Sequence, residues 1–168
     1  MTPLPPPLGP AELVIWRLDE TAYRASWDSG EGSYIFGGRW NGKGVRAVYC
    51  SVDPATAILE VAVHTGFKAL DTIQHVLTAA TITDLSSIHV VEPASLPNPN
   101  WLRPGNPSAG QQAFGDALLT RHAFVVIPSA VSTHSWNVIF VAATAAGAYT
   151  MTMQEAFALD PRLHPPTP

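Results

Sequence analysis

Charged side chains are scarce in this sequence: they make up 13% of its residues, about half the share that is usual in a soluble domain. A surface with so few charges has to be covered by other groups, and a partner protein or a second copy of the chain is one way to cover it. The formal net charge is −4, and an acidic field of this kind repels polyphosphate. The composition therefore argues against direct binding of nucleic acid.

Cysteine is almost absent as well, because Cys50 is the only one in the chain. A single cysteine excludes an intrachain disulfide framework and a cysteine-rich zinc site, and it fits a reducing compartment such as the cytoplasm. The six histidines show no HExxH or other metal-binding spacing. We therefore expect a cytoplasmic protein without a metal site.

The sequence also predicts neither a membrane helix nor a secretion signal. The stretch between Arg121 and Glu155 carries no charge, but polar residues, a proline and a glycine interrupt it before the roughly 18 apolar residues that a membrane helix needs. The N-terminus is rich in proline where a signal peptide would have a basic and then an apolar region. We expect one domain over residues 13–163, between a proline-rich tail over 1–12 and a short tail over 164–168.

Local patterns predict most of the secondary structure. The expected strands are residues 13–18, 47–51, 74–82, 123–127 and 137–142. Asp53 followed by Pro54, with a stop at Gly66, predicts a helix over 54–65, and further helices are expected over 111–122 and 153–159. Residues 30–44 hold six of the 12 glycines, and residues 93–110 hold five prolines, so both segments are expected to lack regular structure.

Glu60 is the first candidate for chemistry. It is the only charge inside the expected helix 54–65, which is apolar nearly all the way round and is therefore expected to be buried. Burying a carboxylate costs several kcal/mol unless a cation or several donors face it. Glu60 is thus either a functional group held by partners, or a structural ion pair or helix-margin carboxylate that reaches water.

The glycine-rich segment supplies candidate cations. Arg39, Lys43 and Arg46 lie in or beside residues 30–44, and guanidinium forks together with exposed backbone N–H groups suit a phosphate or a carboxylate. The segment fits neither the GxGxxG nor the GxxxxGK[ST] pattern, so a nucleotide bound here would be held by another architecture. A solvated loop with scattered arginines explains the same pattern.

Ser129, at the end of an apolar strand, either faces a crevice or is an ordinary turn residue.

Several short motifs follow one another in a fixed order over nearly the whole chain. They are WRL at 16–18, GGRWN at 37–41, VYCS at 48–51, AILEVAVH at 57–64, PSA at 128–130 followed by Asn137, and FALDPRL at 157–163. In this order and spacing the sequence resembles the RES domain family. The most specific part is GGRWN, because Tyr49 follows its arginine by ten residues and Glu60 follows that tyrosine by eleven.

The resemblance implies a fold, an activity and partners. RES proteins are toxins of bacterial toxin–antitoxin pairs with a fold similar to ADP-ribosyltransferase toxins, so it implies an α+β domain with a mostly antiparallel or mixed sheet flanked by helices. It implies an enzyme that cleaves NAD⁺ at the nicotinamide–ribose bond by phosphorolysis or hydrolysis. The alternatives are a protein ADP-ribosyltransferase and a non-catalytic module that binds an antitoxin or a nucleotide. The implied partners are an Xre-like, DNA-binding antitoxin and a second copy of the chain.

The resemblance also implies roles for particular residues. The catalytic set is Arg39, Tyr49, Glu60 and Ser129, and the NAD⁺-binding set is Arg17, Gly38, Arg39, Asn41 and Tyr49. The two arginines would hold phosphates and riboses, Tyr49 would line the nicotinamide side, Glu60 would be the key carboxylate and Ser129 would complete the pocket. After Asn137 the chain departs from the Asn-Pro-His type of segment that often follows in the family, so the role of Asn137 is left open.

Overall fold

The structure is a computed structural model, and it describes residues 12–165. Its strands are β1 (Leu13–Glu20), β2 (Ala47–Ser51), β3 (His75–Ile82), β4 (Ile88–Val90), β5 (Phe124–Pro128), β6 (Trp136–Val141) and β7 (Tyr149–Phe157). Its α-helices are α1 (Glu31–Phe36), α2 (Pro54–Thr65), α3 (Phe67–Thr72) and α4 (Ala109–Arg121), and short 3-10 helices cover Thr21–Ser26, Leu85–Ser87, Pro93–Ser95, Pro99–Leu102 and Pro161–Leu163. Both predicted tails lie mostly outside the described residues.

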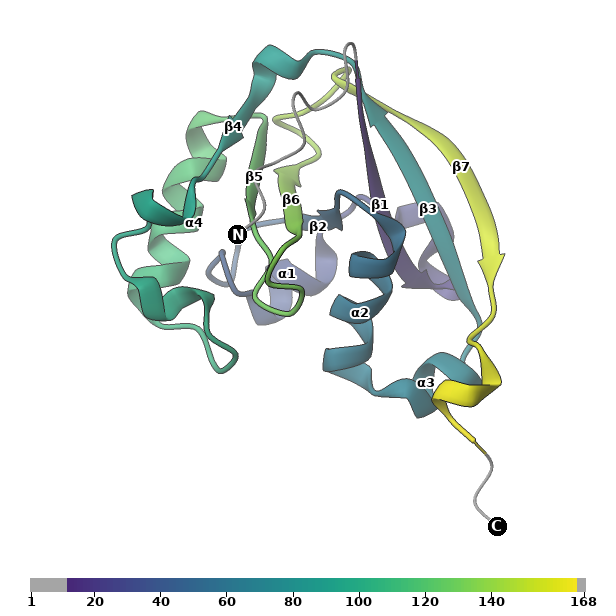
Figure 1. Ribbon diagram of the computed structural model, residues 1–168. Helices are drawn as coiled ribbons and strands as arrows, with labels where there is room; N and C mark the ends of the chain where they lie inside the picture. The colour runs from purple at the N-terminus through teal and green to yellow at the C-terminus, as the bar shows by residue number, and fades with distance from the viewer. Residues whose placement is uncertain (1–11, 166–168) are drawn as a thin grey trace.

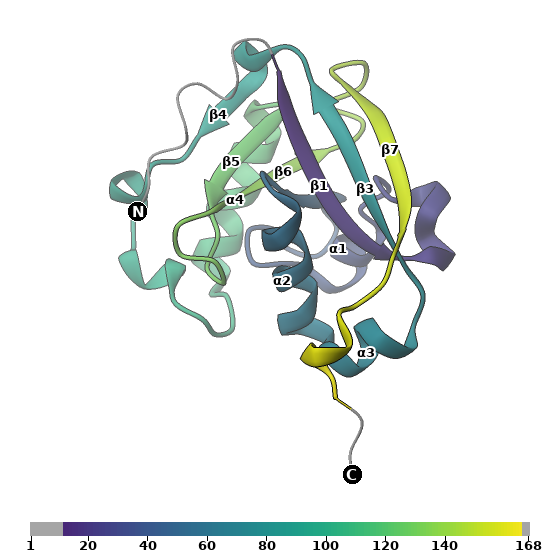
Figure 2. The same ribbon diagram turned by 45° about the vertical axis from the view of Figure 1, so that its right-hand side comes forward.

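All of these strands belong to one mixed sheet. Their order is β4-β5-β6-β2-β1-β3-β7, with β4 parallel to β5 and every other neighbouring pair antiparallel. The sheet is curved, so that its two halves face each other across an apolar core (Figures 1 and 2). Tyr149 of β7 contacts Phe124 of β5 and Phe140 of β6, with ring centroids 6.2 and 4.9 Å apart. The predicted α+β class with a mixed sheet is confirmed.

Helices cover the outside of the curved sheet in two places. Leu118 and Leu119 of α4 pack on strands β5 and β6, whereas Ala62 of α2 and Leu70 of α3 pack on β1 and β3. Figure 1 shows α2 near β1 and α4 beside β4 and β5, as separate helices. Helix α2 also contacts β2, and α4 contacts β6, and these two strands pair near the middle of the sheet order. Polar side chains of those two strands therefore lie near α2 and α4.

Helix α2 follows its sequence signals closely. The Asp53 carboxylate accepts a hydrogen bond from the Thr56 amide at 2.8 Å, Pro54 occupies the first turn and Gly66 ends the helix. Burial opposes ionisation of the Asp53 carboxyl, but hydrogen bonds from Thr56 and Ser135 outweigh it and lower the pKa of Asp53. The expected burial of the whole helix is wrong, since Val63 is 59% exposed. Only one face of α2 packs on the sheet.

Two other local predictions are wrong. Residues 153–159 do not form a helix, because most of them belong to β7, which pairs with β3 along its length. Residues 30–44 were expected to lack regular structure, yet Glu31–Phe36 form the helical turn α1. Glycines at both ends, Gly30 and Gly37, have positive φ angles and stop the helix on either side. The glycines therefore mark the two ends of α1, and most of the helix itself consists of other residues.

Candidate active site

Glu60 is held at the junction of α2, β5 and β6. Its carboxylate oxygen Oε1 accepts hydrogen bonds from the Ser129 hydroxyl at 2.7 Å and from the Asn137 amide at 2.6 Å. Within residues 12–165, no hydrogen bond to the second oxygen, Oε2, is present. Since both donors meet one oxygen, the carboxylate is fixed in orientation while its other oxygen stays available.

The two donors are themselves fixed by further contacts. Ser129, which is 2% exposed, accepts the backbone N–H groups of Val131 and Ser132 at its hydroxyl oxygen, so that its own proton is directed to Glu60. Asn137 accepts a hydrogen bond from the Ser51 hydroxyl at 2.8 Å, which sets the orientation of its amide. The Ser129 hydroxyl is therefore fully engaged, with Glu60 as its acceptor and two backbone N–H groups as its donors.

The partners of Glu60 differ from the expected ones. The sequence predicts that arginine guanidinium groups face this carboxylate, but neutral hydroxyl and amide groups take that place. Moreover, Glu60 is only partly buried, because α2 is exposed on one side. The carboxylate is held by hydrogen bonds and not by an ion pair, and the expected cluster of guanidinium groups around it is absent among the described residues.

Tyr49 and the turn 37–41 form a second network next to this one. The Tyr49 hydroxyl donates to Asn41 Oδ1 at 2.7 Å and accepts the Trp40 backbone N–H at 2.9 Å. Asn41 is fully buried, and its amide donates to the carbonyls of Ser33, Gly42 and Val45. A Cβ atom at Gly38 would lie 2.6 Å from the Tyr49 hydroxyl, so this close approach requires glycine.

Burial disfavours ionisation of the Tyr49 phenol. Burial raises the pKa of Tyr49, the Trp40 N–H opposes that rise, and the charges of Asp116, Arg39 and Glu60 act on the ring as well. Both Arg39 and Glu60 therefore lie close enough to Tyr49 for their charges to affect its pKa. Strand β2 thus links the two networks. It carries Tyr49, which contacts the turn 37–41, and Ser51, which contacts the Glu60 cluster of Glu60, Ser129 and Asn137.

Helix α4 holds the glycine-rich turn from the other side. Gln112 donates to the Gly38 carbonyl at 2.9 Å, and the Asp116 carboxylate accepts the Gly42 N–H. Between them, a Cβ atom at Gly115 would lie 1.8 Å from the Trp40 carbonyl oxygen. The helix backbone therefore packs directly against the turn, and it fixes the position from which Arg39 extends.

Arg39 points along the segment that precedes α4. Its guanidinium group donates to the carbonyls of Trp101 and Arg103 at 3.3 Å each and to the Gly105 carbonyl at 3.1 Å. Arg39 does not contact Glu60 by a hydrogen bond or an ion pair in the part of the chain that the structure describes. These carbonyls carry no net charge, so the positive charge of Arg39 is not neutralised.

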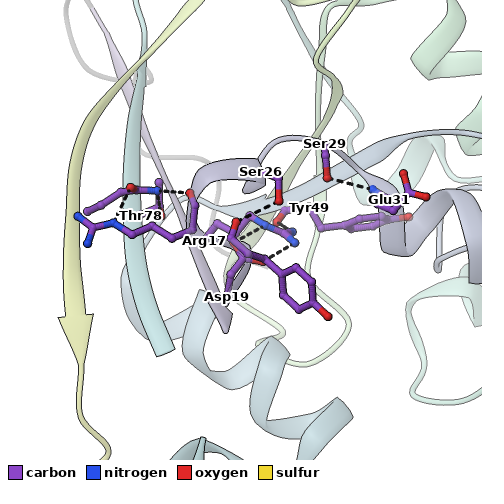
Figure 3. A network of polar contacts seen from close by, with 10 residues as sticks. Arg17, Asp19, Ser26, Ser29, Glu31, Tyr49 and Thr78 are labelled. Carbon is purple, nitrogen blue, oxygen red and sulfur yellow. Dashed lines mark hydrogen bonds and ion pairs between the residues drawn. The ribbon is translucent and has the colours of Figure 1, made fainter. Parts of the chain in front are cut away.

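Arg17 lies in a third network, drawn in Figure 3. Its guanidinium group makes two contacts with the Asp19 carboxylate, at 2.8 and 2.6 Å, and donates to the Tyr49 carbonyl at 2.8 Å. Strands β1 and β2 pair at one position, Trp16 with Ser51, and Arg17 satisfies the Tyr49 carbonyl beyond it. Burial raises the pKa of Asp19, although Arg17 opposes the rise. The structure thus brings Arg17 to the Tyr49 backbone and not to Glu60.

The sequence pointed to Glu60, Tyr49, Arg39 and Ser129 as candidates, but it gave no role to several groups that hold them. Ser51 shares a strand face with Tyr49, which was a usable signal. Asp19 follows Arg17 at the spacing of two that puts side chains on the same strand face. Gln112 and Asp116 carried no such signal, because only the packing of α4 brings them to the turn.

The comparisons with known proteins identify the family. The RES domain family matches residues 14–160. The chain belongs to the RES domain family. A toxin named Toxin Res from Photorhabdus laumondii subsp. laumondii is 30% identical over 76% of this RES chain and 80% of its own length. The Prs ADP-ribosylating toxin of a Sphingobium species is 33% identical over 74% of the chain and 79% of its own length.

A solved structure supports the RES fold. The structure of the M. tuberculosis MbcT-MbcA toxin-antitoxin complex contains a similar fold, with a TM-score of 0.70 and 21% sequence identity. The match covers 88% of this chain and 85% of that one. No helix among residues 12–165 has the length and apolar character needed to cross a membrane. In the same residues, no group of three or more His, Cys, Asp or Glu side chains is placed to hold a metal.

Proposed function

We propose that this chain is the toxin of a toxin–antitoxin pair and that it cleaves NAD⁺ at the nicotinamide–ribose bond. The observation that carries the proposal is the Glu60 carboxylate, with one oxygen fixed by Ser129 and Asn137 and the other available. The names of the relatives agree with a toxin, and the Sphingobium relative is named for ADP-ribosylation. NAD⁺ is the donor in reactions of that class.

The chemistry of the bond explains what Glu60 would do. The bond between ribose C1′ and the pyridinium nitrogen breaks, its electron pair goes to nicotinamide, and the leaving group is neutral without protonation. The ribose develops oxocarbenium character, so the transition state gains most from a fixed negative charge nearby. The available oxygen of Glu60 would supply that charge. Ser129 and Asn137 would keep the carboxylate oriented, and no strong acid is needed.

The remaining candidates would bind and orient the substrate. Arg39, whose charge is not neutralised, suits a phosphate of NAD⁺. Tyr49 is proposed to line the nicotinamide side of the site. Arg17, Gly38 and Asn41, which contact Tyr49 or approach it closely, are proposed to shape the same site. The acceptor is proposed to be water or inorganic phosphate, whose oxygen forms the new bond to C1′ and whose proton passes to solvent.

A protein ADP-ribosyltransferase is the second candidate, favoured by the name of the Sphingobium relative.

Partners are proposed on separate grounds. The structural neighbour is part of a toxin–antitoxin complex, and Phe36 and Val63 of this chain are 74% and 59% exposed. The low share of charged residues, 13% of the chain, also leaves surface for a covering partner. We propose a cognate antitoxin, Xre-like and DNA-binding, with a toxin homodimer in the complex, all acting in the cytoplasm.

The proposed function is tested by following free nicotinamide. Purified chain is incubated with NAD⁺, with and without inorganic phosphate, and with labelled NAD⁺ in a cell lysate. Stoichiometric release in buffer supports cleavage, and a dependence on phosphate identifies phosphorolysis. Transfer of label to a protein without release in buffer would instead support the ADP-ribosyltransferase. Tight NAD⁺ binding with no release in any arm would support a binding module and would contradict the proposal.

A further inference from the structure

A pocket lies beside Arg39, and Glu60, Ser129 and Asn137 are not among the residues that line it. It has a volume of about 240 Å³ and is walled by the segment 98–108, the start of α4 and Arg39. Its lining residues include Arg39 and Arg103, with Asn98, Asn100 and Ser108 among the neutral polar ones. None of the described residues that line it is acidic. In a chain of net charge −4, this is a locally cationic surface.

The Arg39 guanidinium group is fixed at the wall of this pocket. Its hydrogen bonds to the carbonyls of Trp101, Arg103 and Gly105 determine its position without removing its charge. These bonds use Nη1 and Nη2, which leaves Nε and part of Nη2 able to donate to a ligand. Because this guanidinium group is already fixed, it loses little conformational entropy when it binds a tetrahedral anion.

The other arginines near the glycine-rich segment are occupied by carboxylates. Arg46 forms an ion pair with Glu31, and Arg17 forms one with Asp19. Within residues 12–165, neither Arg39 nor Arg103 forms an ion pair. Arg39 and Arg103 therefore keep an uncompensated charge at the pocket, where an added anion can meet both.

The start of α4 acts in the same direction as these arginines. Ser108 caps the helix by accepting the Gln111 N–H at 3.1 Å, and both residues line the pocket. The first turn of a 13-residue helix carries partial positive charge. Two arginines and a helix terminus thus meet in a space large enough for a phosphate group.

We infer that this pocket is a subsite for a phosphate group and that Arg103 is its second cationic ligand, beside Arg39. The inference rests on the proposed function insofar as the phosphate comes from the NAD⁺ pyrophosphate or from inorganic phosphate used as the acceptor. Both sources present the same tetrahedral oxyanion to the two guanidinium groups. Arg103 is exposed, and its structural contact to Arg39 is made by its backbone carbonyl. A change of its side chain therefore leaves the fold intact.

The test measures binding without turnover. ADP-ribose, which has the pyrophosphate but no scissile bond, and inorganic phosphate are titrated separately into the full chain by calorimetry at low ionic strength. The variants are Arg103→Gln and Arg103→Lys. The matched control is Arg121→Gln, which removes the same charge from the exposed end of α4. We expect Arg103→Gln to weaken the binding of ADP-ribose, of inorganic phosphate or of both by about tenfold, Arg103→Lys to weaken it less, and the control to bind as the parent does.

Each outcome decides the inference. Weaker ADP-ribose binding with unchanged phosphate binding assigns the pocket to the substrate pyrophosphate, and the reverse assigns it to the acceptor. Weaker binding of both ligands supports a subsite that takes a phosphate group from either source. If Arg103→Gln binds both ligands like the parent, or if the parent binds neither, the subsite is ruled out. Nicotinamide release is scored independently in the same preparations. Loss of binding in a chain that never releases nicotinamide would keep the subsite and reject the proposed cleavage.

Discussion

The Glu60 cluster and the turn 37–41 lie side by side, yet they differ in what they leave unsatisfied. In the turn, the Tyr49 hydroxyl both donates and accepts, and the fully buried Asn41 amide meets several carbonyls. In the cluster, both donors meet one oxygen of Glu60. A satisfied buried network stiffens a fold, whereas a fixed group with an open acceptor can act on a substrate. On this comparison, we propose that the hydrogen bonds of Tyr49 and Asn41 hold the turn in place, while Glu60 carries the chemistry.

The largest effect is expected where α4 packs on the turn. Gly115→Ala would place a Cβ atom 1.8 Å from the Trp40 carbonyl oxygen. We expect a loss of more than about 3 kcal/mol in the free energy of unfolding, because backbone on both sides has to move. The control is Gly110→Ala in the same helix, where an added Cβ would meet its nearest neighbour at 3.8 Å. Urea denaturation compares the two variants, and equal midpoints would contradict the close packing.

The next effect separates chemistry from folding. Asn137→Ala removes one of the two donors to Glu60 Oε1. We expect kcat for nicotinamide release to fall by about tenfold or more, with a smaller change in KM, because the carboxylate loses its fixed orientation. Gln154→Ala is the matched control, since its amide is hydrogen-bonded to Arg24 at the edge strand β7. A rise in KM alone would mean that Asn137 contacts substrate rather than Glu60.

A smaller effect is expected from the phenol of the turn. Tyr49→Phe leaves the buried Asn41 oxygen and the Trp40 N–H without their shared partner. The expected loss is about 1 to 3 kcal/mol in the free energy of unfolding. Tyr23→Phe is the control, because the Tyr23 side chain is 58% exposed. If Tyr49→Phe lost activity while its denaturation midpoint stayed at the parental value, the phenol would have to act on the substrate itself.

Local chemistry made parts of this fold predictable. The helix 54–65 has its cap, its first-turn proline and its terminal glycine in the sequence, and the structure places α2 on the same residues. The edge strand β7 was not predictable in this way. Its Met, Gln, Glu and Ala residues favour a helix, and pairing with β3 overrides that preference. Strand pairing depends on residues far away in the chain, which a local pattern does not contain.

The same limit applies to the candidate site. Glu60 stood out because it is the lone charge in an apolar helix, and the family spacing marked Arg39 and Tyr49. The contact of Glu60 with Asn137 joins residues 77 positions apart, and Arg39 meets the Arg103 carbonyl across 64 positions. The expectation of guanidinium partners for Glu60 failed for this reason. Proximity in sequence suggested the cations, while packing supplied a serine and an asparagine.

The most direct measurement is nicotinamide release by Glu60→Gln. This change keeps the size of the side chain and removes its charge, so the account predicts a loss of about 100-fold or more in rate, with an unchanged melting temperature and unchanged ADP-ribose affinity. Glu155→Gln, on the exposed edge strand, should release nicotinamide as the parent does. A Glu60→Gln protein that consumes NAD⁺ at the parental rate would contradict the account.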